Sequence, residues 1–357
     1  MDKNPTLIIL TPGFPKNEDD TTCLPPQQVF VKALKENFPG LSIIVLSFIY
    51  PFSQSAYSWK NIPVISFNGK RYRGPLKFFL WKQVEKKLKQ LKEENNILGI
   101  LSFWCGECAL LGSRFGRKHH TRHFCWILGQ DAKKENKYVK RIHPEGGELI
   151  ALSDFIQSEF EKNHGIKPAH IIPPGIDTKE FPLPSMKRDI DVLGAGSLIP
   201  LKQYDIFVET ISELKKTNPS IKALICGKGP ERQSLQTLIS HLGLEDNITL
   251  AGELPHAEAL QLMRRCSVFL HPSSYEGFGV VCIEALYAGA PVISFCKPMN
   301  KDISHWHIVQ TKKEMIEKTL NILQNKNPDH QPVLPYRIDD TAKSMMRLFS
   351  YKEVAIS

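Results

Sequence analysis

The sequence predicts an α/β protein built from two doubly wound domains. Three observations support this prediction. Short apolar runs rich in β-branched residues recur along the chain, segments with helical periodicity separate most of them, and 357 residues are more than one hydrophobic core usually holds. Near-continuous apolar strands that alternate with amphipathic helices are typical of parallel sheets covered on both faces.

Apolar runs mark the expected strands. They lie at residues 6–10, 41–48, 97–104, 123–128, 149–153 and 170–175, and then at 190–196, 221–227, 247–252, 268–273 and 291–295. Helical periodicity is clear between them, for example in QVFVKALKENF and YDIFVETISELKKT. Two series of this length can each bury a core of their own.

A proline-rich stretch at residues 173–184 interrupts the pattern and is the expected linker. We therefore predict an N-terminal domain at residues 1–175 and a C-terminal domain at 176–335. Residues 336–357 should contain a final helix that packs on either domain, including back on the N-terminal one. Its expected apolar residues are Ala342, Met346, Leu348 and Phe349.

Composition excludes disorder as the dominant state, because 42% of the residues are hydrophobic and the mean hydropathy is −0.23. The net charge of +9 suits an anionic partner without choosing among nucleic acid, lipid and phosphorylated substrates. Much of the excess lies in the run from Lys82 to Lys92, where Val84, Leu88 and Leu91 recur at helical spacing. Two interpretations stay open: a solvated helix face, or a surface that contacts anionic lipid or polymer.

The N-terminal residues lack the features of a signal peptide, and no run of about 18 apolar residues predicts a membrane span. We expect a cytoplasmic protein, with peripheral contact at the inner face of the plasma membrane as an option. The eight cysteines are then expected to be reduced, including Cys105 and Cys108 of a lone CxxC pair. The histidines at 119, 120 and 123 are a weak ligand cluster expected in a loop, so no metal site is predicted.

Ligands of doubly wound sheets bind beyond the carboxyl ends of the strands, so the loops that follow strands are informative. The loop after the expected strand at 190–196 contains Gly196, Ser197 and then Lys202 ahead of a helix. Small residues admit a ligand close to the backbone, and a lysine near a helix start suits a diphosphate. The next strand ends in the turn Gly227-Lys228-Gly-Pro. Taken alone, each of these loops is equally well an ordinary turn.

The loop after the strand at 268–273 carries two glutamates around a Gly-Phe-Gly turn. Glu276 precedes the turn, and Glu284 lies about one turn into the following helix. Free amides near Phe278 and Gly279 favour an anion, and the carboxylates can accept hydrogen bonds from hydroxyl groups on either side of it. A sugar nucleotide has these features. The alternative is local capping, with Glu276 at the helix cap and Glu284 as an ordinary first-turn acid.

The arrangement E-G-F-G-x-x-x-x-E-A-x-x-x-G-x-P-V resembles the donor-site signature of the GT-B glycosyltransferases, family 4 in particular. Further segments resemble the same family at residues 150–153, 174–181, 196–202 and 227–230, so that the likeness runs almost continuously from 148 to 295. It implies two Rossmann-like domains that face a central cleft. It also implies a hexosyltransferase-type enzyme that uses a nucleotide-diphosphate sugar and transfers the sugar with retention, without a metal or other cofactor.

The resemblance implies roles for particular residues. Glu276 would contact the donor sugar, Glu284 the ribose and Lys202 the diphosphate, with Asp131 near the reacting centre. The implied donor-binding set is Gly13, Gly196, Ser197, Lys202, Gly227, Lys228, Leu254, Glu276, Gly277, Phe278, Gly279, Val280 and Glu284. The acceptor would be a glycan, a lipid-linked glycan or a small molecule in surface polysaccharide or glycoconjugate synthesis, with no nucleic-acid partner.

The chain departs from the family pattern at several positions. Ser197 stands where relatives usually have arginine, Gln203 where they have glycine, and Leu128 where they have histidine. The segment after Phe295 also lacks the usual G-x-x-E. Two alternatives follow, a catalytically silent nucleotide-sugar-binding protein and a nucleotide-sugar epimerase on the same fold.

Overall fold

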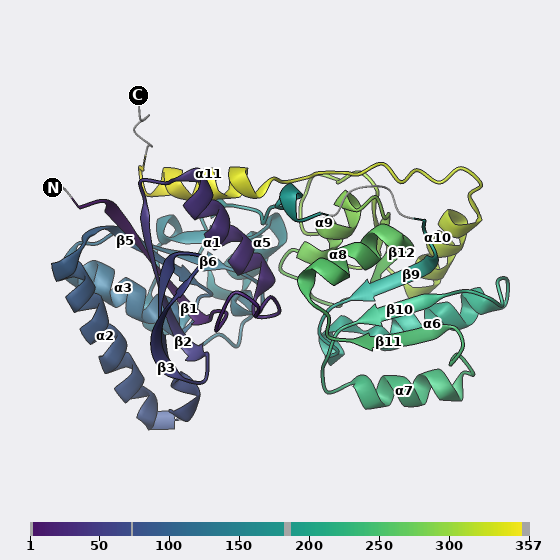
Figure 1. Ribbon diagram of the computed structural model, residues 1–357, viewed down its shortest axis with the longest axis horizontal. Coiled ribbons are helices and arrows are strands. Elements are labelled where there is room, and N and C mark those ends of the chain that lie inside the picture. Colours follow the sequence, from purple (N-terminus) through teal and green to yellow (C-terminus); the bar gives the residue numbers. More distant parts are fainter. Residues whose placement is uncertain (1–2, 73, 182–186, 352–357) are drawn as a thin grey trace. The chain divides into compact units, whose positions relative to one another are not determined.

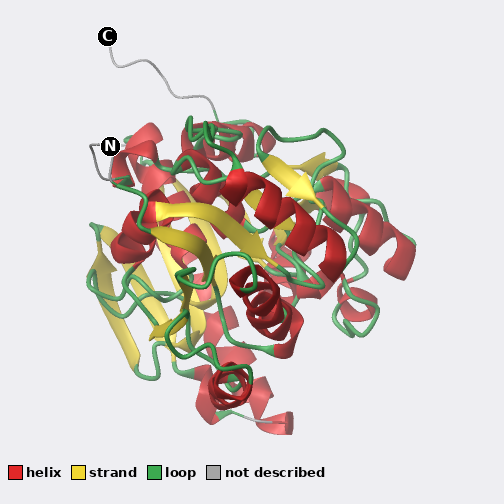
Figure 2. Cartoon of the chain, turned by 90° about the vertical axis from the view of Figure 1, so that its right-hand side faces the viewer, coloured by secondary structure: helices red, strands yellow, loops and turns green. Residues whose placement is uncertain are grey.

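The computed structural model describes residues 3–72, 74–181 and 187–351. The chain forms two compact units, the first comprising the described parts of Met1–Gly175 and Ile338–Ser357, and the second comprising those of Ile176–Arg337. Each unit contains one sheet with helices packed on it (Figure 1), and Figure 2 shows the strands in yellow and the helices in red. The predicted α/β class with two domains is confirmed. Part of the expected linker, residues 182–186, lies outside the described residues.

The first unit contains an eight-stranded sheet in the order β3-β4-β2-β1-β5-β6-β7-β8. Its neighbouring strands are parallel except for the antiparallel pair β3 and β4. The strands are β1 (Pro5–Gly13), β2 (Ser42–Tyr50), β3 (Gln54–Trp59), β4 (Ile62–Phe67), β5 (Asn96–Phe103), β6 (His123–Ile127), β7 (Leu149–Ala151) and β8 (His170–Ile171). The helices are α1 (Pro25–Asn37), α2 (Lys77–Glu94), α3 (Glu107–His119), α4 (Val139–Ile142), α5 (Asp154–His164) and α11 (Ile338–Leu348).

The second unit contains a six-stranded parallel sheet in the order β11-β10-β9-β12-β13-β14. The strands are β9 (Ile190–Ala195), β10 (Ala223–Cys226), β11 (Ile248–Gly252), β12 (Cys266–His271), β13 (Val292–Ser294) and β14 (Trp306–Ile308). The helices are α6 (Tyr204–Lys215), α7 (Arg232–His241), α8 (His256–Arg265), α9 (Val280–Tyr287) and α10 (Lys312–Gln324). The chain order reverses between β9 and β12, which makes their carboxyl ends the switch point where ligands bind in such sheets.

The core of the second unit explains the apolar runs. Val192, Phe269 and Ile293, on the adjacent strands β9, β12 and β13, are completely buried. Side chains of successive residues point to opposite faces of a strand, so a strand covered by helices on both sides must be apolar at nearly every position. Phe207 of α6 is also completely buried, in the same core as Val192.

Three strands, β3, β4 and β14, were not predicted. The strand β3 is largely exposed and polar, so it lacks the apolar run by which the other strands are recognised. It pairs with β4 through a two-residue turn at Lys60 and Asn61, which have φ values of 47° and 60°. Two positive φ values are the geometry that matches the twist of a hairpin. The third, β14, has only three residues.

The C-terminal helix α11 belongs to the first unit. It packs on α1, where the Asn37 side-chain amide donates a hydrogen bond of 2.6 Å to Asp339. The Thr341 hydroxyl donates a second hydrogen bond, of 2.9 Å, to the Pro173 carbonyl in the segment after β8. Ala342, Met346 and Phe349 are buried as expected, together with Met345, whereas Leu348 is only half-buried. The apolar face of the helix therefore includes Met345, which was not predicted, and Leu348 lies at its edge.

In the ranges 3–72, 74–181 and 187–351, no helix combines the length and the apolar composition that crossing a bilayer requires.

Candidate active site

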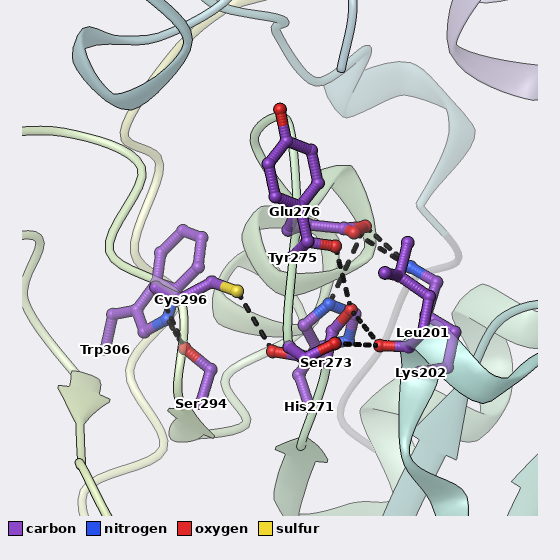
Figure 3. A network of polar contacts seen from close by, with 10 residues as sticks. Leu201, Lys202, His271, Ser273, Tyr275, Glu276, Ser294, Cys296 and Trp306 are labelled. Carbon is purple, nitrogen blue, oxygen red and sulfur yellow. Dashed lines mark hydrogen bonds and ion pairs between the residues drawn. The ribbon is translucent and has the colours of Figure 1, made fainter. Parts of the chain in front are cut away.

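Two loops meet at the switch point of the second sheet. The first follows β9 and contains a 3₁₀ turn at Pro200–Lys202, and the second follows β12 and leads to α9. The backbone amide and the hydroxyl of Ser274 donate hydrogen bonds of 2.9 and 3.1 Å to the Leu201 carbonyl. Neighbouring strand ends and these bonds place the predicted diphosphate loop and the predicted sugar loop side by side (Figure 3).

The structure joins Lys202 to Glu276 in an ion pair. The Lys202 ammonium lies 2.6 Å from Glu276 Oε1 and 2.9 Å from Oε2, and the two side chains are only 15% and 16% exposed. His271, at the end of β12, is buried, and its Nε2 lies 3.8 Å from Glu276 Oε1 (Figure 3). That distance is too long for a hydrogen bond, and Nε2 has no other partner among the described residues.

His271 and Lys202 together determine the protonation state of Glu276. Burial alone would raise the pKa of this carboxyl group, but His271 and Lys202 lower it to about 2. Burial also lowers the pKa of His271 itself, so the permanent cation beside Glu276 is Lys202. The site therefore holds an ionised carboxylate and an ammonium group side by side, and each can be redirected to a ligand group of opposite polarity.

The residue after Lys202 has an unusual backbone. Gln203 caps α6 with φ and ψ both 48°, in the left-handed region. Glycine adopts this conformation without strain, whereas a residue with a side chain adopts it at a cost of about 1 kcal/mol. The geometry explains why a glycine suits this position, where the family resemblance shows glycine and this chain has Gln203.

Glu284 lies in α9 and is engaged by a histidine that the sequence analysis did not single out. His256 Nε2 lies 2.8 Å from Glu284 Oε1, and His256 Nδ1 lies 3.5 Å from Glu180 Oε2. Burial opposes protonation of His256, but the contacts with Glu180 and Glu284 outweigh it and raise its pKa to about 10. His256 is the first residue of α8, after β11 at the same sheet edge. The one feature of the sequence that could have identified His256 is its position in the segment after an expected strand.

The glycine turns after β9 and β10 pack backbone to backbone. Gly196 and Gly227 have φ values of 150° and 152°, and a Cβ atom on Gly227 would lie 1.8 Å from the Gly196 carbonyl oxygen. The Gly196 amide also donates a hydrogen bond of 2.9 Å to the Cys226 carbonyl. The glycines therefore allow the two loops to pack together, and their contact with a donor stays a prediction.

The other predicted donor contacts of the second unit lie along the same edge. Phe278 is buried between the rings of Trp306 and Tyr336, at centroid distances of 6.2 and 5.7 Å, and so anchors the loop by packing. Lys228 is exposed and forms an ion pair with Glu253. The remaining positions are in loops after strands or at the start of α9, and they are Ser197, Leu254, Gly277, Gly279 and Val280.

Gly13 and Asp131 belong to the first unit. Gly13 is the last residue of β1, and Asp131 lies in the loop after β6. The Asp131 carboxylate accepts hydrogen bonds from the backbone amides of Cys105, at 2.7 Å, and Gly129, at 2.8 Å. Burial raises the pKa of Asp131 to about 6 in spite of these amides. Its visible role is to hold two loops together, and a role at the reacting centre stays a prediction.

The cysteines and histidines form no metal site in the described part of the chain. Cys105 and Cys108 are buried free thiols. The expected loop around the histidines is wrong in part, because His119 ends α3 and His123 begins β6. The prediction relied on the charged residues around the histidines and overlooked the helical periodicity, which continues through His119.

Two family models match the chain. The model described as "Glycosyltransferase Family 4" matches residues 27–180, and the one described as "Glycosyl transferases group 1" matches residues 176–332. Between them they cover most of both units. The chain belongs to the family 4 glycosyltransferases of GT-B fold.

Curated relatives are similar at low identity. The chain is 25% identical over 203 residues to the gpi3 subunit of phosphatidylinositol N-acetylglucosaminyltransferase from Schizosaccharomyces pombe, a match that covers 55% of this chain and 44% of the relative. It is 26% identical over 238 residues to a GDP-mannose-dependent α-(1-6)-phosphatidylinositol monomannoside mannosyltransferase of Mycolicibacterium smegmatis, covering 59% and 62%. The chain thus spans about half the length of the curated relatives it matches.

Solved structures match over nearly the full length. Sucrose-phosphate synthase from Thermosynechococcus elongatus has a TM-score of 0.69 at 16% identity, covering 97% of this chain and 96% of the other. The Anabaena protein HepE in complex with UDP and glucose has a TM-score of 0.67 at 17% identity, covering 96% and 94%. At these identities the likeness shows the fold alone.

Proposed function

We propose that this chain transfers a sugar from a nucleotide-diphosphate donor to an acceptor hydroxyl group, with retention at the anomeric carbon and without a metal ion. The observation that carries the proposal is the partly buried ion pair of Lys202 and Glu276 at the switch point of the second sheet. Family membership and relatives named as glycosyltransferases support it.

In this proposal, binding of the donor separates Lys202 from Glu276. The Lys202 ammonium turns to the diphosphate, and the first amides of α9 bind the same anion, because a helix N-terminus carries partial positive charge. Glu276 is then free to accept hydrogen bonds from the sugar hydroxyls. The bond between the anomeric carbon and the diphosphate oxygen breaks, and its electron pair stays with the diphosphate. The acceptor oxygen bonds to the same face of that carbon, and its proton passes to the oxygen of the departing diphosphate.

Metal independence follows from where charge develops in this reaction. The departing diphosphate gains negative charge, and a fixed ammonium group with oriented amides stabilises such charge in a water-poor site. Lys202 and the start of α9 provide these groups at one sheet edge. We therefore assign the stabilisation of the leaving group to the protein itself.

Glu284 would bind the ribose of the donor. His256 holds Oε1 of this carboxylate at 2.8 Å, which leaves Oε2 to accept hydrogen bonds from the vicinal hydroxyls. The side chain of Glu284 is only 11% exposed, so a ligand could approach Oε2 from one side only. We infer that His256 is a positioning residue, because it orients the carboxylate without itself touching the ribose.

The acceptor is proposed to be a glycan, a lipid-linked glycan or a small molecule. Two relatives bear names that describe transfer to phosphatidylinositol or its mannoside, which favours a lipid-linked acceptor. Peripheral contact with an anionic membrane surface belongs to the same proposal.

A nucleotide screen tests the proposed function. UDP, GDP and ADP, each alone and as sugar conjugates, are added to the protein, and its thermal midpoint is measured. We expect one base to raise the free energy of unfolding by about 2.7 kcal/mol at a hundredfold excess over its dissociation constant. The matching sugar conjugate should then be turned over with acceptor extracts. Tight binding without turnover would support a silent binding protein, conversion without acceptor an epimerase, and no binding at all would contradict the proposal.

His256→Gln should raise the donor KM about tenfold with little change in kcat, because a charged hydrogen bond that orients Glu284 is lost. The pKa of His256 is raised from 6.5 to about 10 by folding, so its protonation stabilises the fold fully below pH 6.5 and this contribution disappears as the pH rises through 10. The destabilisation caused by the substitution, measured by denaturant unfolding, should shrink over the same range.

The matched control is Glu180→Gln, which neutralises the partner in the longer contact of His256, leaves the 2.8 Å contact with Glu284 in place and should change KM less. A loss of kcat with unchanged KM in His256→Gln would contradict the positioning role.

A further inference from the structure

The exposed apolar side chains of the first unit are concentrated in one place. Within the described residues, the large hydrophobic side chains classed as exposed all lie between residues 49 and 79, and they are Ile49, Phe52, Leu76, Phe78 and Phe79. The three phenylalanines are 52–54% exposed. Single exposed apolar residues are ordinary on protein surfaces, whereas a group of aromatic ones marks an interaction surface. We call these five residues the apolar tip.

Local packing brings the end of β2 close to the start of α2. Ile49 and Phe52 lie at the end of β2 and just after it, and the other three lie at the start of α2. Gly69 lies between these elements, because a Cβ atom there would be 2.4 Å from the Phe48 carbonyl oxygen and 2.8 Å from a Leu80 methyl group. The Gln83 side chain also donates a hydrogen bond of 2.8 Å to Tyr72, which ties the connecting segment to α2.

Basic side chains accompany the tip. The Lys70 ammonium lies 4.0 Å from the ring centroid of Phe52, and the Lys82 ammonium lies 4.5 Å from that of Phe78. Lys82, Lys86 and Lys89 are exposed and follow Phe78 at spacings of four, four and three residues. Such spacings place them on one face of α2. This face is therefore aromatic at its N-terminal end and carries three exposed lysines along its length, together with Glu85 and Glu93.

We propose that the apolar tip and the lysine face of α2 form a docking surface for an anionic lipid membrane. Aromatic side chains insert at the boundary between headgroups and acyl chains, and lysines bind the anionic headgroups beside them. Long lysine side chains can lie along the apolar layer while their ammonium groups stay in water. A protein partner would need an acidic and apolar surface of matching shape, whereas a membrane requires only the combination seen here.

The proposal changes the sequence-based interpretation of α2. The run from Lys82 to Lys92 left open a solvated face or an anionic surface. The buried residues Leu80, Val84, Leu88 and Leu91 face the core, so the run supplies charge but no apolar anchor. The anchor comes from the residues that precede it. The inference rests on the proposed function only for its purpose, which is to bring a lipid-linked acceptor to the enzyme.

The test is co-sedimentation of the full chain with vesicles of phosphatidylcholine, with and without about one third phosphatidylglycerol, in the absence of donor. The wild-type protein should bind the anionic vesicles and lose binding as salt is raised. Phe78→Ser/Phe79→Ser should weaken binding at least about tenfold, because two half-exposed phenylalanines lose their apolar transfer energy. Lys82→Glu/Lys86→Glu should weaken it on anionic vesicles only.

The matched control reverses two exposed lysines of the second unit, Lys301→Glu/Lys326→Glu, and should reduce binding less than the change on α2. All four changed α2 residues are exposed, so circular dichroism and thermal unfolding should confirm an intact fold. Unchanged binding in Phe78→Ser/Phe79→Ser would overturn the proposal. A wild-type dimer that this variant converts to monomer, without vesicle binding, would instead identify a second copy as the occupant.

The failure of this inference and that of the proposed function are separable. The Phe78→Ser/Phe79→Ser variant should still transfer sugar to a water-soluble acceptor, and Glu276→Gln should still bind vesicles. Vesicle binding without transfer in the wild-type protein would contradict the function and leave the docking surface supported.

Discussion

Glu276→Gln is expected to lower kcat for transfer by about 10³-fold, the upper range for loss of one preorganised electrostatic contact in an active site. The substitution keeps the shape of the side chain but removes the negative charge that faces Lys202 at 2.6 and 2.9 Å. The donor sugar then loses the charged acceptor that fixes its position. The measurement is a steady-state transfer assay with the donor identified by the nucleotide screen.

Binding of the nucleoside diphosphate should respond in the opposite direction. In the proposed donor complex of the wild-type protein, the diphosphate has to compete with Glu276 for the Lys202 ammonium, because the two side chains form an ion pair. Without that carboxylate the ammonium is available at once, so the dissociation constant of the nucleoside diphosphate should stay the same or fall. A parallel loss of affinity and turnover would mean that Glu276 supports the fold of the site instead of the reaction.

The pH dependence gives a second check on Glu276. Its pKa lies near 2, so the carboxylate is ionised throughout the pH range in which the protein can be assayed. An acid limb in the kcat profile near pH 4–5 should therefore not come from this residue.

Ser274→Ala is the matched control for Glu276→Gln, because Ser274 is exposed in the same loop and keeps its backbone bond to Leu201.

Lys202→Met is expected to lower kcat/KM by about 10²–10³-fold and also to weaken binding of the nucleoside diphosphate, because the charge that stabilises the leaving group is lost. This combination distinguishes it from Glu276→Gln, which should spare binding. Calorimetric titration with the nucleoside diphosphate at two salt concentrations measures the effect. Affinity that remains equal to the wild type would contradict the diphosphate role.

Stability adds a further expectation for Lys202. Lys202→Met leaves the Glu276 carboxylate buried without its cation, and such a change destabilises proteins by about 3 kcal/mol. The double variant Lys202→Met/Glu276→Gln removes both charges, so its free energy of unfolding should recover part of that loss. Lys202→Arg keeps the charge and should fall between the wild type and Lys202→Met in activity. Equal unfolding energies for the single and double variants would argue against the ion pair.

Much of the fold could be predicted from local patterns. The strands β9 and β12 and the helices α6 and α9 lie where the apolar runs and helical periodicities predicted them. What local patterns missed is equally specific. The strand β3 is polar because it lies at the edge of its sheet and is largely exposed, and an edge strand need not be apolar.

The residues of the candidate site divide in the same way. Lys202, Glu276 and Glu284 are visible in the sequence because each follows a strand in a glycine-containing or helix-starting segment. His256 also follows a strand and starts a helix, but neither its segment nor its spacing predicts that it will bridge Glu180 and Glu284. Its partner Glu284 is 28 residues away, and only the order of the strands brings the two together.

Local sequence patterns are enough to predict the alternation of strands and helices and the loops of the candidate site. Both are local properties, since a doubly covered strand must be apolar and a close backbone approach requires glycine. Contacts between distant segments are needed to establish that Lys202 pairs with Glu276, 74 residues away, that His256 contacts Glu284, and that Phe78 and Phe79 remain exposed. Each of these depends on which strands are neighbours and which helix faces are covered, and contacts between distant segments determine both.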